Sequence, residues 1–186
     1  MSCRALTLAI SFPTLLAAQA KADKDTLNSA LLWRDSTSFF ITPPPGWVIN
    51  SEVAKDEGPM AVFYRSGESW QSGIAVMYVS MLDLPDTSPQ RFKEKVRLEV
   101  ADWARRAGDA VITPLPDQLV EGHTVLMRKF VSRSHDAYEA VAYFWQGSTA
   151  PVLVLSARTD TAYQRAYPDF LRLVRSYGPG PKVLQK

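Results

Sequence analysis

The sequence of 186 residues has very few of the side chains that most often carry reactive chemistry. It contains one cysteine, Cys3, and two histidines, His123 and His135. A zinc site needs three or four cysteine, histidine or carboxylate ligands, and disulfides and thiol catalysis need cysteine. We therefore expect no metal site, no cofactor and no cysteine chemistry, and a stability that rests on the hydrophobic core alone.

Residues 1–20 predict an export signal. Arg4 precedes a mostly apolar run over residues 5–18, which has the length of a signal-peptide core and is shorter than the ~20 residues needed to cross a bilayer. The run ends in Ala18-Gln19-Ala20, two small residues around a larger one, which suits a signal peptidase. We expect cleavage after Ala20, or after Ala22 as the second choice. The alternative is a buried N-terminal helix, which Pro13 in the middle of the run disfavours.

Removal of this leader would give a periplasmic chain with little net charge. Cys3 precedes the apolar run, whereas the lipid-bearing cysteine of an exported lipoprotein follows it, so we expect no lipid anchor. The full chain has a net charge of +2, and the leader holds only one charged residue, Arg4. This balance predicts no nucleic-acid partner and no strong attraction to an anionic membrane. No later apolar run reaches membrane length, so no stable membrane insertion is expected after cleavage.

The hydrophobic pattern predicts one α+β domain between a short lead-in and a tail. The lead-in, residues 21–37, could form a partial helix carrying Leu27, Leu31 and Leu32. The domain covers residues 38–177, and residues 178–186, rich in glycine and proline, are expected to form a flexible tail. Within the domain, runs of β-branched and aromatic residues predict strands. The strands expected in its first half are 38–42, 47–49, 60–65 and 74–82.

One amphipathic helix is expected over residues 89–107. Ser88 is a good N-cap, Pro89 suits the first helical position, and Gly108 suits the C-terminal cap. The apolar residues recur at steps of three and four, so the helix should lie on one side of a sheet. These residues are Phe92, Val96, Val100, Trp103 and Ala107.

The second half predicts a meander of strands and a closing helix. Hairpin-length turns join the expected strands, so neighbours should be antiparallel, and the near-continuous apolar run 152–158 should be central. The other expected strands are 119–120, 123–133 and 137–146. The final helix, 161–177, should be kinked or split by Pro168. The fold class is α+β, a mostly antiparallel sheet with helices packed on its faces.

Three features of the chain resemble the Mog1/PsbP-like family, which includes bacterial DcrB-type domains. A strand runs into proline, glycine and tryptophan at Phe40-Ile41-Thr42-Pro43-Pro44-Pro45-Gly46-Trp47. A long amphipathic helix separates the early strands from a meander. The apolar strand at 152–157 leads to a helix that closes on Val174-Arg175-Ser176-Tyr177. The resemblance implies an α-β-α sandwich and non-enzymatic roles such as assembly factors, secretion adaptors and immunity proteins, and it supplies no catalytic residues.

The residues themselves also predict no catalytic site. Ser134-His135-Asp136 looks like a hydrolase triad, but adjacent residues in a turn cannot form the required relay, so we expect a hairpin turn. The pairs Asp56 with Glu57 and Asp83 with Asp86 lie in polar loops, where charge is ordinary, rather than in an expected cleft. Phosphate-binding glycine motifs are absent from the sequence. The chain is therefore predicted not to be an enzyme.

The tryptophans are the better indication of binding. Trp47 and Trp103 fall on positions that face the core, whereas Trp70 lies in a polar loop. Packing under the loop is the ordinary role of such a residue, but an exposed aromatic also suits an interface. We predict that Trp70, Glu68 and Arg65 contribute to a partner-binding surface.

The function expected from the sequence is that of an exported binding or assembly protein of the bacterial envelope that acts through protein–protein contacts. The first alternative is a periplasmic immunity protein that inhibits a secreted toxin through residues 68–72. The second is a small-molecule or lipid carrier with a pocket between sheet and helix.

Overall fold

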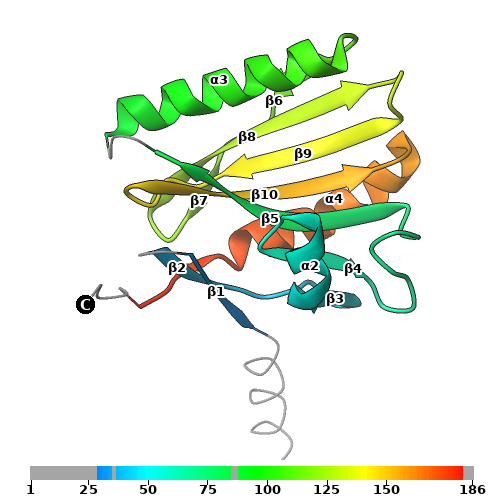
Figure 1. Ribbon diagram of the computed structural model, residues 1–186, viewed down its shortest axis with the longest axis horizontal. Coiled ribbons are helices and arrows are strands. Elements are labelled where there is room, and N and C mark those ends of the chain that lie inside the picture. The colour runs from blue at the N-terminus through cyan, green and yellow to red at the C-terminus, as the bar shows by residue number, and fades with distance from the viewer. Residues whose placement is uncertain (1–28, 35–36, 85–87, 182–186) are drawn as a thin grey trace, which may run out of the picture.

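An antiparallel sheet of eight strands forms the middle layer of the protein (Figure 1). The computed structural model describes residues 29–34, 37–84 and 88–181, so the expected signal peptide lies outside the described residues. The strand order confirms that the apolar strand β10 is central. The order is β3 (Trp47–Asn50), β4 (Ala61–Arg65), β5 (Ala75–Asp83), β10 (Thr149–Ala157), β9 (Ala137–Tyr143), β8 (His123–Ser132) and β6 (Val111–Pro114), with β7 (Gln118–Val120) paired to β8.

Two long helices cover opposite faces of this sheet. Helix α3 (Pro89–Ala107) lies across one face, and α4 (Asp160–Arg175) lies behind the other (Figure 1). Alternate residues of β10 belong to the two cores, since Leu155 packs in the cluster with α4 and Val154 in the cluster with α3. This arrangement confirms the expected α+β class with helices on both faces of the sheet.

Helix α3 begins and ends where its capping residues predict. The Ser88 hydroxyl accepts a hydrogen bond from the Arg91 amide at 3.3 Å. Gly108 follows the last helical residue with a φ of 73°, a backbone conformation that glycine adopts without a steric cost. Phe92 and Val96 bury the helix against the sheet.

A second, three-stranded sheet corrects two expectations about the ends of the domain. It consists of β1 (Ala30–Arg34), β2 (Thr37–Ile41) and β11 (Gly178–Pro179). The described part of the lead-in is therefore a strand rather than a partial helix. The start of the tail is also held in place, because the Gly180 amide donates to the Ser38 carbonyl at 2.9 Å. Both segments form part of the folded unit.

Helix α4 is a single helix, so Pro168 does not split it in two. Proline lacks the amide that would bond to the carbonyl of Gln164, one turn earlier. Both residues are exposed, so water can satisfy that carbonyl. Thr159 caps the helix by accepting a hydrogen bond from the Ala162 amide at 3.1 Å.

A short helix, α2 (Ser51–Glu57), follows β3 and was not expected. Its N-cap is Asn50, whose side-chain oxygen accepts hydrogen bonds at 3.0 Å from the amides of Glu52 and Val53.

Over the residues that the structure describes, no helix combines the length and the apolar character needed to cross a membrane.

Candidate functional site

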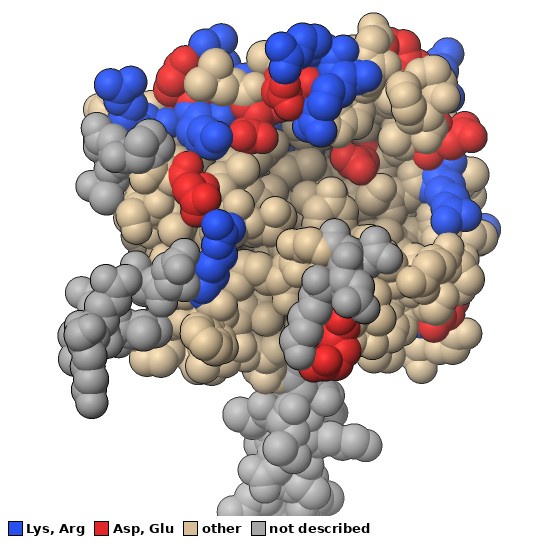
Figure 2. Space-filling model, viewed as in Figure 1, with Lys and Arg blue, Asp and Glu red and all other residues tan. Residues whose placement is uncertain are grey.

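The two sides of the large sheet are covered unequally. On β5 and β10, Met77 and Leu155 face α4 and are fully buried. On the α3 side Val141 and Val154 are also buried, but other residues are partly exposed, among them Tyr78, Glu139 and Ser156. We call the surface formed by these three residues the open face. Charged side chains gather over α3, whereas a broad, largely uncharged area lies below that helix (Figure 2).

The strand register places these three polar side chains together. Glu139 of β9 pairs directly with Ser156 of β10, and Tyr78 of β5 pairs with Val154, two residues before Ser156. Because side chains two residues apart on a strand share a face, all three point to the α3 side. The neutral side chain of Ser156 is therefore a direct neighbour of the Glu139 carboxyl group on this face.

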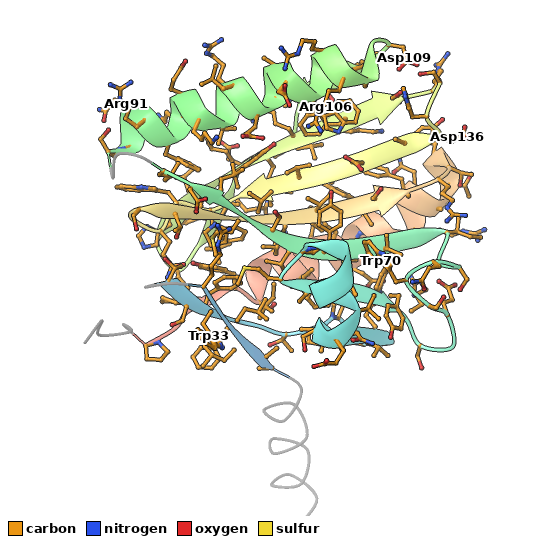
Figure 3. The ribbon with its side chains drawn as sticks, in the orientation of Figure 1. Trp33, Trp70, Arg91, Arg106, Asp109 and Asp136 are labelled. Atoms are coloured by element: carbon orange, nitrogen blue, oxygen red, sulfur yellow. The ribbon has the colours of Figure 1, made fainter. Side chains whose placement is uncertain are left out.

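Two tryptophans and an arginine border the open face. Trp103 of α3 packs on Phe130 with the ring centroids 4.8 Å apart. Trp70 meets Tyr78 edge to face, with centroids 6.0 Å apart. Arg106 of α3 and Trp70 lie on the same side of the sheet, on either side of this region (Figure 3).

A hollow of about 250 Å³ lies between the C-terminal half of α3 and the sheet. Among the described residues that line it, Glu139 is the only carboxylate, and the aromatic ring of Trp103 provides part of the wall. The lining residues are Trp103, Arg106, Ala107, Ser132, His135, Ala137 and Glu139.

Burial raises the pKa values of two side chains on the open face. It raises the pKa of Glu139, an effect that the nearby Ser156 hydroxyl partly opposes. Burial also raises the pKa of Tyr78, and the nearby charge of Glu139 adds to that rise. Within the described part of the chain, no lysine, arginine or histidine forms an ion pair with Glu139. The open face therefore holds a desolvated carboxylate without a cationic partner.

Glu139 is a candidate residue that the sequence interpretation missed. A signal was present, because Glu139 lies two and four residues before Val141 and Tyr143 on one strand. Alternation places all three side chains on the same, largely buried face. A charged residue in phase with buried apolar ones is unusual and often has a functional cause.

The structure divides the three residues predicted to bind a partner between the two sides of the sheet. Arg65 turns to the α4 side, where it pairs with Asp169 at 3.1 Å and lies 5.0 Å from the ring centroid of Trp47. Glu68 is exposed on the loop, and Trp70 turns to the α3 side. Of the three, Trp70 borders the open face, and the binding of a partner by these residues stays a prediction.

The turn at 134–136 contains hydrogen bonds between serine and histidine, but their order excludes a catalytic triad. His135 Nδ1 lies 2.9 Å from the hydroxyls of both Ser132 and Ser134. The Ser132 hydroxyl donates to Asp109 Oδ1 at 2.5 Å, so its proton goes to the acid and not to histidine. In a triad the histidine lies between serine and acid. Here the hydrogen bond from Ser132 lowers the pKa of Asp109 to about 2 and fixes the β8–β9 hairpin beside α3.

The remaining candidate groups form no reactive site in the described residues. His123 is exposed, and no group of three metal-binding side chains occurs over the described ranges. Asp83 pairs with Arg34 at 3.1 Å. The other carboxylates of the expected acidic pairs, at positions 56, 57 and 86, lie outside the described side chains.

No family model matches the chain, and no curated protein matches it. Solved structures do match. The solution structure of cyanobacterial PsbP (CyanoP) from Synechocystis has a TM-score of 0.51 and 11% identity, over 82% of this chain and 93% of the other. The Ran-binding protein Mog1p of Saccharomyces cerevisiae has a TM-score of 0.48 and 16% identity, over 81% and 95% of the two chains. The chain thus has a Mog1/PsbP-like fold, while membership of the DcrB-type subgroup stays a prediction.

Proposed function

We propose that this chain is a non-enzymatic binding or assembly protein, exported to the periplasm, which holds a partner protein against the open face. The observation that carries the proposal is the incomplete cover of the sheet on its α3 side, bordered by Trp70 and Trp103. Tryptophan, tyrosine and arginine are the residues most enriched in the energetic centres of protein interfaces. All three types meet at this surface.

The fold supports a binding role without defining the partner, because one fold carries many functions. Mog1p of Saccharomyces cerevisiae is a Ran-binding protein, and that property belongs to Mog1p. For this chain the supporting features are its own aromatic border and its partly exposed polar floor.

Trp70→Ala tests the binding face, and Trp33→Ala is the matched control. Trp33 is 70% exposed on the small sheet, away from Trp70 (Figure 3). Each purified variant would be used as bait in a cross-linking pull-down from envelope extract. We expect Trp70→Ala to lower capture of the partner at least tenfold with a nearly unchanged melting temperature, and Trp33→Ala to leave capture unchanged. Loss of capture only with Trp33→Ala would place the interface on the small sheet and contradict the proposal.

Export is tested separately by sequencing the N-terminus of the protein recovered from the periplasm. The leader pattern predicts a mature chain that begins at Lys21, or at Asp23 if cleavage follows the second site. Recovery of the chain from the cytoplasm with Met1 in place would contradict the export part of the proposal. Stoichiometric capture of one secreted toxin would narrow the function to that of an immunity protein.

A further inference from the structure

In the part of the chain that the structure describes, no cationic side chain forms an ion pair with Glu139. Its carboxyl group faces the hollow beneath α3, burial raises its pKa, and its neighbour in the strand register is the neutral residue Ser156. Removing a carboxylate from water without a cation close by is costly. The presence of Glu139 without a cationic partner is explained if a group from another molecule supplies the positive charge.

The buried acid on the other side of the sheet shows how this protein neutralises a structural carboxylate. Asp169 is also buried, but Arg65 and Arg172 reach it at 3.1 and 2.8 Å, and Trp47 Nε1 donates to it at 3.0 Å. Asp169 therefore has a complete set of internal partners. Glu139 has an open approach from solvent in place of those partners.

The charges around the hollow favour a cationic occupant. Arg106 also lines the hollow, but its side chain is 67% exposed and its Nε atom pairs with Asp102 at 3.0 Å. Water and that partner both weaken its field, whereas the field of Glu139 acts in a less polar environment. His135 faces the hollow with its Nδ1 atom already bonded to Ser132 or Ser134.

We propose that the open face receives a lysine side chain of the partner protein, whose ammonium group pairs with Glu139. This inference rests on the proposed function and names the chemistry of the partner. An ammonium group is compact and has three donors, which suits the carboxylate and the adjacent hydroxyl of Ser156. The aliphatic stem of the lysine would lie along Trp103 in the hollow.

Butylammonium reproduces the lysine side chain without its backbone and serves as the direct probe. The carboxyl carbon of Glu139 would be followed by ¹³C NMR in the full mature protein, with butanol and butyrate as neutral and anionic controls of the same length. We expect a saturable shift with butylammonium in the millimolar range, a fall in the pKa of Glu139, and no such shift with butanol. Absence of a saturable shift, or a stronger response to butyrate, would overturn the inference.

Glu139→Gln tests the same pair in the complex. Glu139→Gln would remove a charge-assisted hydrogen bond, so affinity for the captured partner should fall about ten- to hundredfold. Because the substitution removes an unpaired buried charge and keeps the side chain's shape, its melting temperature should be equal or higher. Asp136→Asn is the control, since Asp136 is an exposed acid in the adjacent turn (Figure 3).

The two proposals fail in different ways. If Trp70→Ala weakens capture and Glu139→Gln does not, the lysine inference is wrong and the proposed binding face stands. If neither substitution weakens capture, the open face is not the interface and both proposals are wrong. A melting temperature that falls by several degrees in Glu139→Gln would make Glu139 a structural residue and would also overturn the inference.

Discussion

The network around Asp169 gives the sharpest test of what stabilises the α4 side of the sheet. Trp47 is 6% exposed, and its Nε1 atom donates to Asp169 Oδ2 at 3.0 Å. Asp169→Ala removes this acceptor and leaves the indole N–H buried without a partner. Such an unsatisfied donor costs about 1–3 kcal/mol.

The two arginine partners of Asp169 add less. The side chains of Arg65 and Arg172 are 42% and 62% exposed, so water replaces much of each lost ion pair. Pairs of this kind contribute up to about 1 kcal/mol each. We expect Asp169→Ala to lower the free energy of unfolding by about 3 kcal/mol in total. For a domain of this size, that loss corresponds to a fall in melting temperature of roughly 6–12 °C.

Urea unfolding followed by tryptophan fluorescence and circular dichroism would measure this loss. Trp47→Phe supplies the critical background, because phenylalanine has no N–H to leave unpaired. In that background Asp169→Ala should cost about 2 kcal/mol or less, and Arg172→Ala alone should cost about 1 kcal/mol or less. An equal cost of Asp169→Ala with and without the indole would refute the assignment of the loss to the Trp47 hydrogen bond.

Three further substitutions test particular contacts. Asp109→Asn should destabilise the protein near neutral pH but not in strong acid. The pKa of Asp109 is lowered to about 2 from 3.8, so its contribution to stability is present above pH 3.8 and is lost as the pH falls towards 2. Urea titrations of both proteins at several pH values check this, and a constant gap between them would count against it. Gly108→Ala should cost about 1 kcal/mol, because its φ of 73° strains alanine although the space around it is open, and thermal unfolding measures the loss. Gly180→Ala would place a Cβ 2.7 Å from the Ser38 carbonyl carbon, so the segment after α4 should detach from β2. The amide of residue 180, which donates to the Ser38 carbonyl, should then exchange hydrogen faster, and unchanged exchange would contradict the contact.

Local signals explain which elements the sequence predicts well. Helix α3 carries its own N-cap, proline, apolar stripe and terminal glycine, and the structure places its ends at those residues. Short turns between apolar runs likewise predict the antiparallel meander from β8 to β10. In each case the deciding interactions lie within a few residues along the chain.

Elements that depend on distant partners were missed or misassigned. Strand β1 is a strand because it pairs with β2, and β11 pairs with β2 from the other end of the chain. Helix α2 was missed for a different reason. Its capping residues Asn50 and Gly58 are recognisable in the sequence, but its seven residues lack a long apolar stripe. The contact between Arg65 and Asp169 spans 104 residues, so no local pattern could have shown that Arg65 turns away from Trp70.

Neighbouring residues of the central strands face opposite sides of the sheet, so one can stabilise the core while the next faces the proposed binding surface. Leu155 is fully buried against the α4 side, so truncation to alanine should cost about 2–5 kcal/mol. Its neighbour Ser156 points to the open face, where it lies opposite Glu139 in the strand register. Because β10 is packed firmly on its α4 side, the side chains on its other side are held in place without a second complete layer over them. The incomplete cover by α3 is therefore compatible with a stable domain, and it leaves the polar floor accessible to a partner.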